Sequence, residues 1–149
     1  MKMSTRSRYG LRLMVYLGVK FGNGSIRLNE VAEHEKISEK YLEQIVPYLK
    51  TAKLITSQRG STGGYQLSCP PDKITLKEII EPLEGSLILV DCTKKNEYGC
   101  SLQGTCATSG MWSELGGIIS NFLHTTKLSD LVKTFNNKRT KTNNDMYYI

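Results

Sequence analysis

Apolar side chains recur at helical spacing in three stretches of the first fifty residues. The pattern predicts an amphipathic helix over residues 5–21, a short helix over 28–35 and a third over 39–50. Only a few residues join the last two stretches, and the third has a polar outer face. Two short helices connected in this way are typical of a helix-turn-helix, in which the second helix reads DNA.

Two residues set the limits of the expected reading helix. Ser38 precedes it and is expected to act as its N-cap, because a serine hydroxyl can accept a hydrogen bond from an unpaired backbone N–H. Pro47 removes a backbone donor and is expected to kink the second half of the helix. Base contacts are therefore expected from its first two turns. The predicted buried stripe consists of Leu42, Ile45, Val46 and Leu49.

Two strand-like stretches follow, over residues 54–59 and 65–68. They flank the run Gly60–Gly64, whose glycines permit the positive φ angles of a hairpin loop. Arg59 lies at the base of this hairpin, where it is placed to enter a minor groove. A helix-turn-helix followed by a glycine-rich hairpin predicts a winged-helix DNA-binding domain.

The C-terminal half is predicted to contain a short helix over 75–83, a polar loop over 91–107, a longer helix over 109–124 and a last helix over 128–135. The apolar stripe of the longer helix is wide, which favours burial against a second copy of the chain, although a plain core helix is the alternative. The polar residues 136–145 are expected to be disordered.

We therefore expect a mainly α-helical fold with a small β-hairpin wing. The predicted organisation is a winged helix-turn-helix domain over 1–85, a cysteine loop over 86–107, dimerisation helices over 108–135 and a polar tail over 136–149.

Charge supports a nucleic-acid partner. The chain has a formal net charge of +6. Residues 1–66 hold 11 basic and five acidic residues, whereas residues 67–149 hold nine of each. A one-sided basic region is expected of a protein that neutralises DNA phosphates.

The longest apolar run, Leu87–Val90, is too short to cross a membrane. These features predict a cytoplasmic protein, in which thiols stay reduced.

Three cysteines, Cys92, Cys100 and Cys106, lie within fifteen residues, with no histidine between them. Clustered thiols in a reducing compartment favour metal binding. Zinc sites usually have cysteine pairs two to four residues apart, and the spacing here is wider. An iron–sulfur cluster is therefore favoured over zinc or a redox thiol switch.

The chain resembles the IscR-type regulators of the Rrf-two winged-helix family over about residues 1–135. Four features carry the resemblance, namely Ser4–Gly10, Ile37–Gln44, Arg59–Tyr65 and Trp112. It implies that the three cysteines ligate an iron–sulfur cluster, with 2Fe–2S favoured over 4Fe–4S. It also implies a homodimer formed through the long helix, which binds a palindromic site in double-stranded DNA.

The resemblance implies that Glu43 shapes which class of DNA site is bound. A carboxylate accepts hydrogen bonds from a cytosine amino group and repels phosphates. The alternative is a solvated residue that pairs with Lys40 or Lys50. The predicted DNA-binding set is Ser38, Glu39, Lys40, Tyr41, Glu43, Gln44, Arg59, Gly60, Ser61, Gly63 and Gly64.

The chain departs from IscR-type proteins at one position. Those proteins have a histidine three residues after the last cysteine, and Ser109 stands there in this chain. NsrR-type relatives can use an acidic residue near the N-terminus of the partner subunit, where this chain has Arg8. Serine is a poor ligand, and Cys69 is expected to be a buried structural cysteine. The fourth position is left to Asp91, Glu97, Cys69, His34 or a solvent molecule.

The leading functional hypothesis is a repressor of iron–sulfur cluster biogenesis genes that senses its own cluster. Alternatives are an NsrR-like sensor of nitric oxide, a CymR-like regulator of cysteine metabolism and, in a different class, an iron–sulfur carrier. CymR-type proteins lack the cysteine triad. The sequence shows no nucleophile–base motif, phosphate loop or pair of catalytic carboxylates, so an enzyme is not expected.

Overall fold

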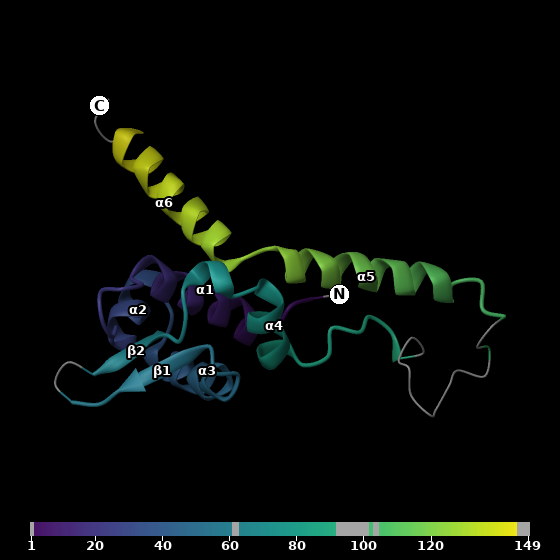
Figure 1. Ribbon diagram of the computed structural model, residues 1–149, viewed down its shortest axis with the longest axis horizontal. Helices are drawn as coiled ribbons and strands as arrows, with labels where there is room; N and C mark the ends of the chain where they lie inside the picture. The colour runs from purple at the N-terminus through teal and green to yellow at the C-terminus, as the bar shows by residue number, and fades with distance from the viewer. Residues whose placement is uncertain (1, 61–62, 92–101, 103–104, 146–149) are drawn as a thin grey trace.

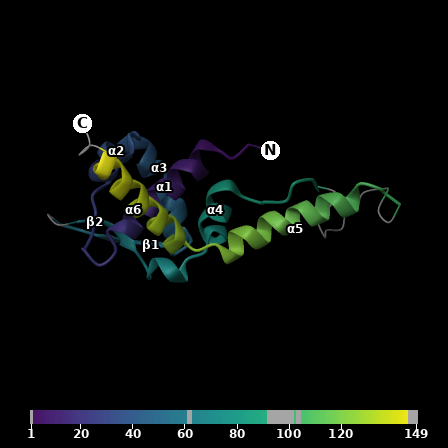
Figure 2. The same ribbon diagram turned by 90° about the horizontal axis from the view of Figure 1, so that it is seen from above.

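Helices α1, α2 and α3 form a bundle that carries a two-stranded wing, α6 packs against α1, and α5 projects away from the bundle (Figures 1 and 2). The computed structural model describes residues 2–60, 63–91, 102 and 105–145. The elements are α1 (Thr5–Val19), α2 (Leu28–Glu35), α3 (Glu39–Thr51), β1 (Ile55–Gln58), β2 (Gly64–Leu67), the 3-10 helix η1 (Pro71–Lys73), α4 (Leu76–Glu84), α5 (Ser109–Thr125) and α6 (Leu128–Asp145). This mainly helical fold with one hairpin confirms the predicted fold class.

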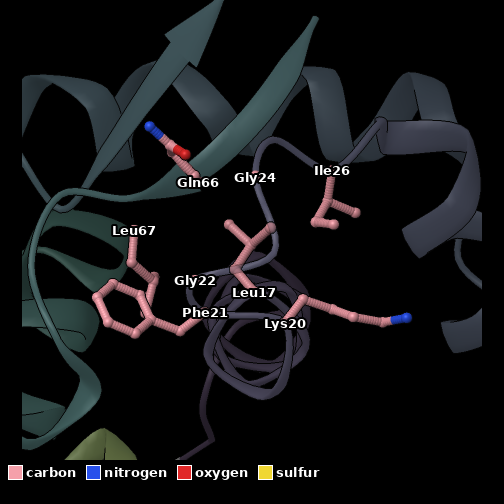
Figure 3. Close-up of a pocket in the computed structure, with 8 residues that line it drawn as sticks. All are labelled: Leu17, Lys20, Phe21, Gly22, Gly24, Ile26, Gln66 and Leu67. Carbon is pink, nitrogen blue, oxygen red and sulfur yellow. The ribbon is translucent and has the colours of Figure 1, made fainter. Parts of the chain in front are cut away.

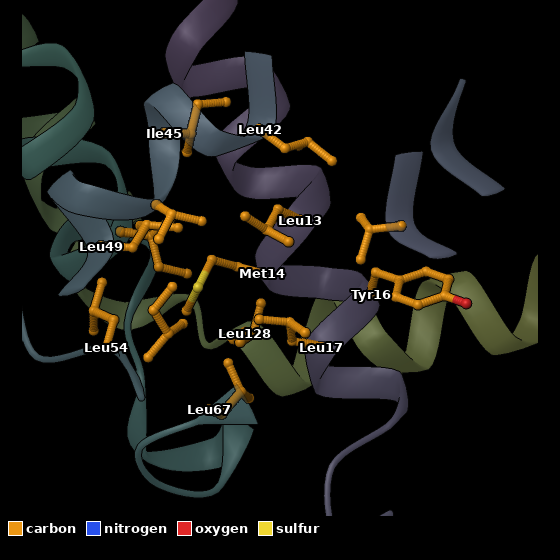
Figure 4. Close-up of a cluster of buried hydrophobic side chains, with 14 of the residues drawn as sticks. Leu13, Met14, Tyr16, Leu17, Leu42, Ile45, Leu49, Leu54, Leu67 and Leu128 are labelled. Carbon is orange, nitrogen blue, oxygen red and sulfur yellow. The ribbon is translucent and has the colours of Figure 1, made fainter. Parts of the chain in front are cut away.

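Helix α1 runs through the centre of the core and contacts α2, α3, α4 and α6. Its Leu13 and Met14 are fully buried and lie among side chains of α3, the wing and α6 (Figure 4). Gly10 permits this close packing, because a Cβ atom there would collide with Leu83 and lie 3.3 Å from Ile45 Cγ2. Apolar burial on this scale is the main source of stability in a small domain.

The wing is a short antiparallel hairpin in which Ile55 faces Leu67 and Gln58 faces Gly64. A third segment extends it, because Ile26 and Tyr65 exchange two backbone hydrogen bonds of 2.8 Å. A pocket of about 340 Å³ lies where the wing meets the turn after α1 (Figure 3). The wing is therefore tied to the segment that leads into α2.

Helix α5 is attached to the domain mainly through its C-terminal end. The backbone of Leu76 donates to the carbonyl of Thr126 at 3.0 Å, and that of Leu128 donates to Ile74 at 2.9 Å. From this junction α5 projects away from the bundle, as both ribbon views show (Figures 1 and 2). None of its residues is buried.

Two expectations need correction. The last helix does not end at Phe135 but continues to Asp145, so residues 136–145 are helical. Packing of Leu128 and Val132 on the core anchors its first turns, after which each further residue extends the helix at little cost.

Ser38 occupies the N-cap position of α3, but its side chain makes no capping hydrogen bond. Its carbonyl instead accepts from the Tyr41 and Leu42 backbones.

Helix α3 is continuous from Glu39 to Thr51 and includes Pro47, and the kink at Pro47 stays a prediction. Pro47 lies on the exposed side of the helix, where a missing backbone donor leaves nothing buried and unpaired. Among the residues that the structure describes, no helix is long and apolar enough to cross a membrane.

Candidate nucleic-acid interface and cysteine segment

Helix α3 presents its polar residues on the side away from the core. Its four predicted stripe residues are buried. Glu39, Lys40, Glu43 and Gln44 are exposed, and Tyr41 is half-buried. Glu43 forms no ion pair with Lys40 or Lys50 in the described structure, and the Lys50 ammonium donates to the Ser57 hydroxyl at 3.0 Å. The first turns of α3 are therefore available to a partner.

The turn before α3 is held by Arg12 of α1. Its Nε donates to Glu35 Oε2 at 2.8 Å, and Nη2 donates to the Glu35 carbonyl. The Arg12 guanidinium lies 5.6 Å from the centre of the Tyr9 ring, which packs edge-on against Tyr41 at the same centroid separation. Sequence reasoning did not identify Arg12, because its partner is 23 positions away and no local pattern links the two.

The wing lies beside one edge of α3. A hollow of about 430 Å³ separates them and brings Glu39 and Glu43 opposite Gly60, Gly63 and Gly64. Other residues of the predicted set lie nearby. Arg59 is exposed directly after β1, and Ser61 lies outside the described residues. The structure thus places the reading helix and the wing glycines around one concave surface.

Only one member of the cysteine triad falls in the described part of the chain. Cys106 is half-buried just before α5, and Cys92 and Cys100 lie outside the described residues. Cys106 Sγ is 3.3 Å from the Thr108 hydroxyl. Hydrogen bonding to the side chain and then the backbone of Thr108 lowers the pKa of the Cys106 thiol. A lowered pKa favours the thiolate, which is the form that binds metals.

Among the described candidates for the fourth ligand, His34 lies far from Cys106 (Figures 1 and 2). Ser109 donates its hydroxyl to the Cys106 carbonyl at 3.0 Å. His34 belongs to α2, which lies at the opposite end of the molecule from the start of α5 (Figures 1 and 2). There its ring packs 4.7 Å from that of Tyr16 and 5.7 Å from that of Phe135.

Cys69 is half-buried against the core, in keeping with a structural cysteine, and Glu97 lies outside the described residues. The ranges that the structure describes contain no group of three or more His, Cys, Asp or Glu side chains that could hold a metal ion. Asp91 is exposed and leads directly into the cysteine segment.

An apolar hollow of about 670 Å³ lies between α5 and the rest of the chain. The segment Leu87–Val90 lines it together with Trp112, Leu115 and Phe122. Ile118 and Phe122 of α5 are 60% and 61% exposed, so the helix carries a large uncovered apolar face. Exposed apolar surface of this kind usually marks an interaction site.

Comparisons with known proteins agree with this architecture. The family model named Rrf2, described as an iron-dependent transcriptional regulator, matches residues 3–134. The chain is 38% identical to the transcriptional regulator CymR of Bacillus subtilis over 131 residues, which cover 88% of this chain and 89% of CymR. It is 35% identical to IscR of Cereibacter sphaeroides over 136 residues, covering 89% and 88%.

Solved structures give the same result. The structure of CymR, the global cysteine regulator of B. subtilis, superposes with a TM-score of 0.74 at 36% identity, and the match covers 90% of this chain and 98% of that one. IscR of T. potens superposes with a TM-score of 0.72 at 33% identity, covering 90% and 88%. These relatives are transcriptional regulators, a class of proteins that are not enzymes. The chain belongs to the Rrf2 family of winged-helix transcriptional regulators.

Proposed function

We propose that this protein is a cytoplasmic repressor of iron–sulfur cluster biogenesis genes and senses the occupancy of its own cluster. The observation that carries the proposal is the triad Cys92, Cys100 and Cys106, inserted between the DNA-binding domain and α5. IscR-named relatives at 33–35% identity support it. Gain or loss of the cluster at the triad would therefore affect both the DNA-binding domain that precedes it and helix α5 that follows it.

In the proposed complex, α3 enters the major groove of a palindromic promoter site. The exposed residues Lys40, Glu43 and Gln44 would face base edges, and Arg59 would enter the flanking minor groove. The wing glycines Gly60, Gly63 and Gly64, together with Ser61, would let the backbone approach the DNA closely. Ser38, Glu39 and Tyr41 complete the proposed set.

We place a second copy of the chain on α5. The exposed face formed by Ile118 and Phe122 adjoins a hollow lined by Trp112 and Leu115, so a second α5 would cover apolar surface on both chains. Two-fold pairing through one helix also presents two reading helices to two half-sites, as a palindrome requires.

The donor set fits an iron–sulfur cluster. Three thiols are present, and the described one, Cys106, is accessible and has a lowered thiol pKa. Cys92, Cys100 and Cys106 would hold the cluster, with 2Fe–2S favoured over 4Fe–4S. When bound, it would supply a redox- and iron-sensitive group whose loss reports cluster shortage. Ser109 is engaged with the Cys106 carbonyl, which leaves the fourth ligand to another group.

The proposal is tested by anaerobic purification followed by promoter binding. We expect coloured protein containing iron, and an affinity for promoter DNA that differs between the cluster-loaded protein and Cys92→Ala. Thr105→Ala, in the same segment but without a thiol, is the matched control. Colourless, iron-free protein would contradict the cofactor. Equal affinity and site preference in all forms would contradict the sensing role.

A CymR-like regulator of cysteine metabolism is the second candidate, and the 38% identity to CymR favours it. In that case the cysteines hold no cluster, and Cys92→Ala binds DNA as the wild type does. If a cluster is present, Mössbauer spectra separate 2Fe–2S from the 4Fe–4S type expected of an NsrR-like sensor of nitric oxide. Rapid transfer of the cluster to an acceptor, without promoter binding, would instead indicate a carrier.

A further inference from the structure

A second hollow flanks α3 on the side of α1, away from the wing. Its volume is about 520 Å³. Tyr41, Gln44 and Tyr48 follow one another along this side of the helix at spacings of three and four residues, and Arg6 closes the hollow from α1. Gln44 and Tyr48 are exposed. A surface beside a reading helix faces the phosphates that border the major groove, because a helix 10–12 Å wide nearly fills a groove about 12 Å wide.

The guanidinium of Arg6 is held in place by three contacts. Its Nε donates to the carbonyl of Leu83 at 2.6 Å, and Nη1 donates to the hydroxyl of Tyr48 at 3.0 Å. The guanidinium carbon also lies 4.5 Å from the centre of the Tyr48 ring. Neither hydrogen bond uses Nη2, and the Tyr48 hydroxyl, which accepts from Arg6, keeps its own proton to donate. Both groups can therefore donate to one oxyanion.

The two sides of α3 differ in charge. The hollow on the wing side is lined by two carboxylates, those of Glu39 and Glu43, and by one cation, Arg27. Among the described residues, Arg6 is the one charged residue that lines the hollow on the α1 side. Glu84 lies near Arg6, but its Oε2 accepts from the hydroxyls of Ser4 and Ser7 at the start of α1. Within these two hollows, a phosphate is therefore attracted more strongly to the α1 side, where no carboxylate accompanies the cation, than to the wing side.

We infer that Arg6 and Tyr48 bind a backbone phosphate of the DNA strand that borders the major groove on the α1 side of α3. The inference rests on the proposed placement of α3 in the major groove, but not on the cluster. Because a phosphate contact carries no sequence information, this pair sets the depth and register of the helix while Glu43 and Gln44 face the bases. Tyr41, whose ring is fixed by Tyr9, lies along the same strand.

The salt dependence of DNA binding tests the assignment. Wild-type protein, Arg6→Gln, Arg6→Lys and Tyr48→Phe are titrated at several salt concentrations against a duplex selected by the wild type from a random library. Removing one phosphate contact reduces the slope of log affinity against log salt by about 0.9 per bound protomer. We expect this reduction for Arg6→Gln and an affinity loss of roughly three- to tenfold for Arg6→Gln and Tyr48→Phe. Arg6→Lys should keep the slope.

The matched control is Lys133→Gln, which removes the same charge from α6, where the side chain is 75% exposed. An equal reduction in slope for Lys133→Gln would show a general charge effect and overturn the site, as would an unchanged slope for Arg6→Gln. If the DNA affinity of the wild type does not depend on salt concentration, the proposed binding of DNA through α3 is contradicted. The phosphate site of Arg6 and Tyr48 is then contradicted as well. Thermal melting of each variant separates these results from loss of fold.

A neutral phosphate provides a second test that does not depend on the stability of any variant. Single methylphosphonates are placed along the selected duplex, and wild-type affinity is measured for each. A methylphosphonate at one position, on the strand beside α1, should weaken DNA binding by the wild type. The same methylphosphonate should cause a smaller loss of affinity in Tyr48→Phe and Arg6→Lys. Additive losses at every position would overturn the pairing of Arg6 and Tyr48 with a phosphate.

Discussion

The Ser4 hydroxyl donates to Glu84 Oε2 at 2.7 Å, which joins the N-cap of α1 to the last residue of α4 across 80 positions of sequence. The Ser4 backbone N–H donates to Glu84 Oε1 at 3.1 Å, and the Ser7 hydroxyl also reaches the carboxylate. A carboxylate at a helix N-terminus satisfies donors that lack intrahelical partners and favours the helix dipole. This contact ties the end of α4 to the start of α1.

Stability should therefore depend on the ionisation of Glu84. Hydrogen bonds from Ser7 and then Ser4 lower the pKa of the Glu84 carboxyl in the folded protein. The carboxylate therefore stabilises the fold fully above the ordinary glutamate pKa, and this stabilisation is lost as the pH falls through the lower pKa of the folded state. Chemical denaturation of Glu84→Gln at neutral pH should show a loss of about 1 kcal/mol. Its unfolding free energy should also fall less steeply than that of the wild type below about pH 4.3. Equal pH profiles would contradict this role.

Gly10→Ala should destabilise the domain by about 2 kcal/mol, because the added methyl group would meet Leu83 and Ile45 in a packed core. Thermal or urea unfolding measures the change. Gly110→Ala is the matched control, since a Cβ atom there meets nothing within 4 Å, and its effect should stay within about 0.5 kcal/mol. Similar losses in both variants would show that α1 and α4 do not require this close approach.

Glu43→Ala should leave stability unchanged within about 0.5 kcal/mol, because the side chain is exposed. Discrimination between DNA sites should change by about 1–3 kcal/mol at the base pair it faces, as measured by competition between operator variants. Glu33→Ala removes an equally exposed carboxylate from α2 and should leave site preference as in the wild type. A change in overall affinity without a change in preference would argue against base contact by Glu43.

Thr108→Val should raise the pKa of the Cys106 thiol, because the Thr108 hydroxyl is the main cause of its lowering. In cluster-free protein, alkylation of Cys106 by iodoacetamide accelerates as pH rises through that pKa. Mass spectrometry of the labelled peptide should therefore give a midpoint at higher pH for Thr108→Val than for the wild type. An unchanged midpoint would show that the contact of Cys106 with Thr108 is absent in solution.

Ile118→Glu should weaken self-association at least tenfold, because it places a charge on the exposed apolar face of α5. Analytical ultracentrifugation measures the dissociation constant. The control Ser113→Glu adds the same charge at an exposed position of α5 that lies about 140° around the helix from Ile118. If both variants associate as the wild type does, a second copy does not cover this face.

Much of the fold could be predicted because it depends on local pattern. The spacing of Leu42, Ile45 and Leu49 determines which side of α3 is buried, and the glycines after Arg59 determine where the hairpin turns. These signals lie within one element. The length of α6 could not be read in this way, because packing of Leu128 and Val132 on distant residues of α1 nucleates a helix that its polar second half would not form alone.

The family, the helical pattern that includes α3 and the three thiols could be recognised in the sequence, because each depends on residue identity at short spacing. The contacts that support α3 became visible only in the tertiary structure. Arg6 meets Tyr48 across 42 positions and Arg12 meets Glu35 across 23. Side chains so far apart in sequence come together only when burial of the core brings α1 alongside α2 and α3. No periodicity along the chain records that geometry.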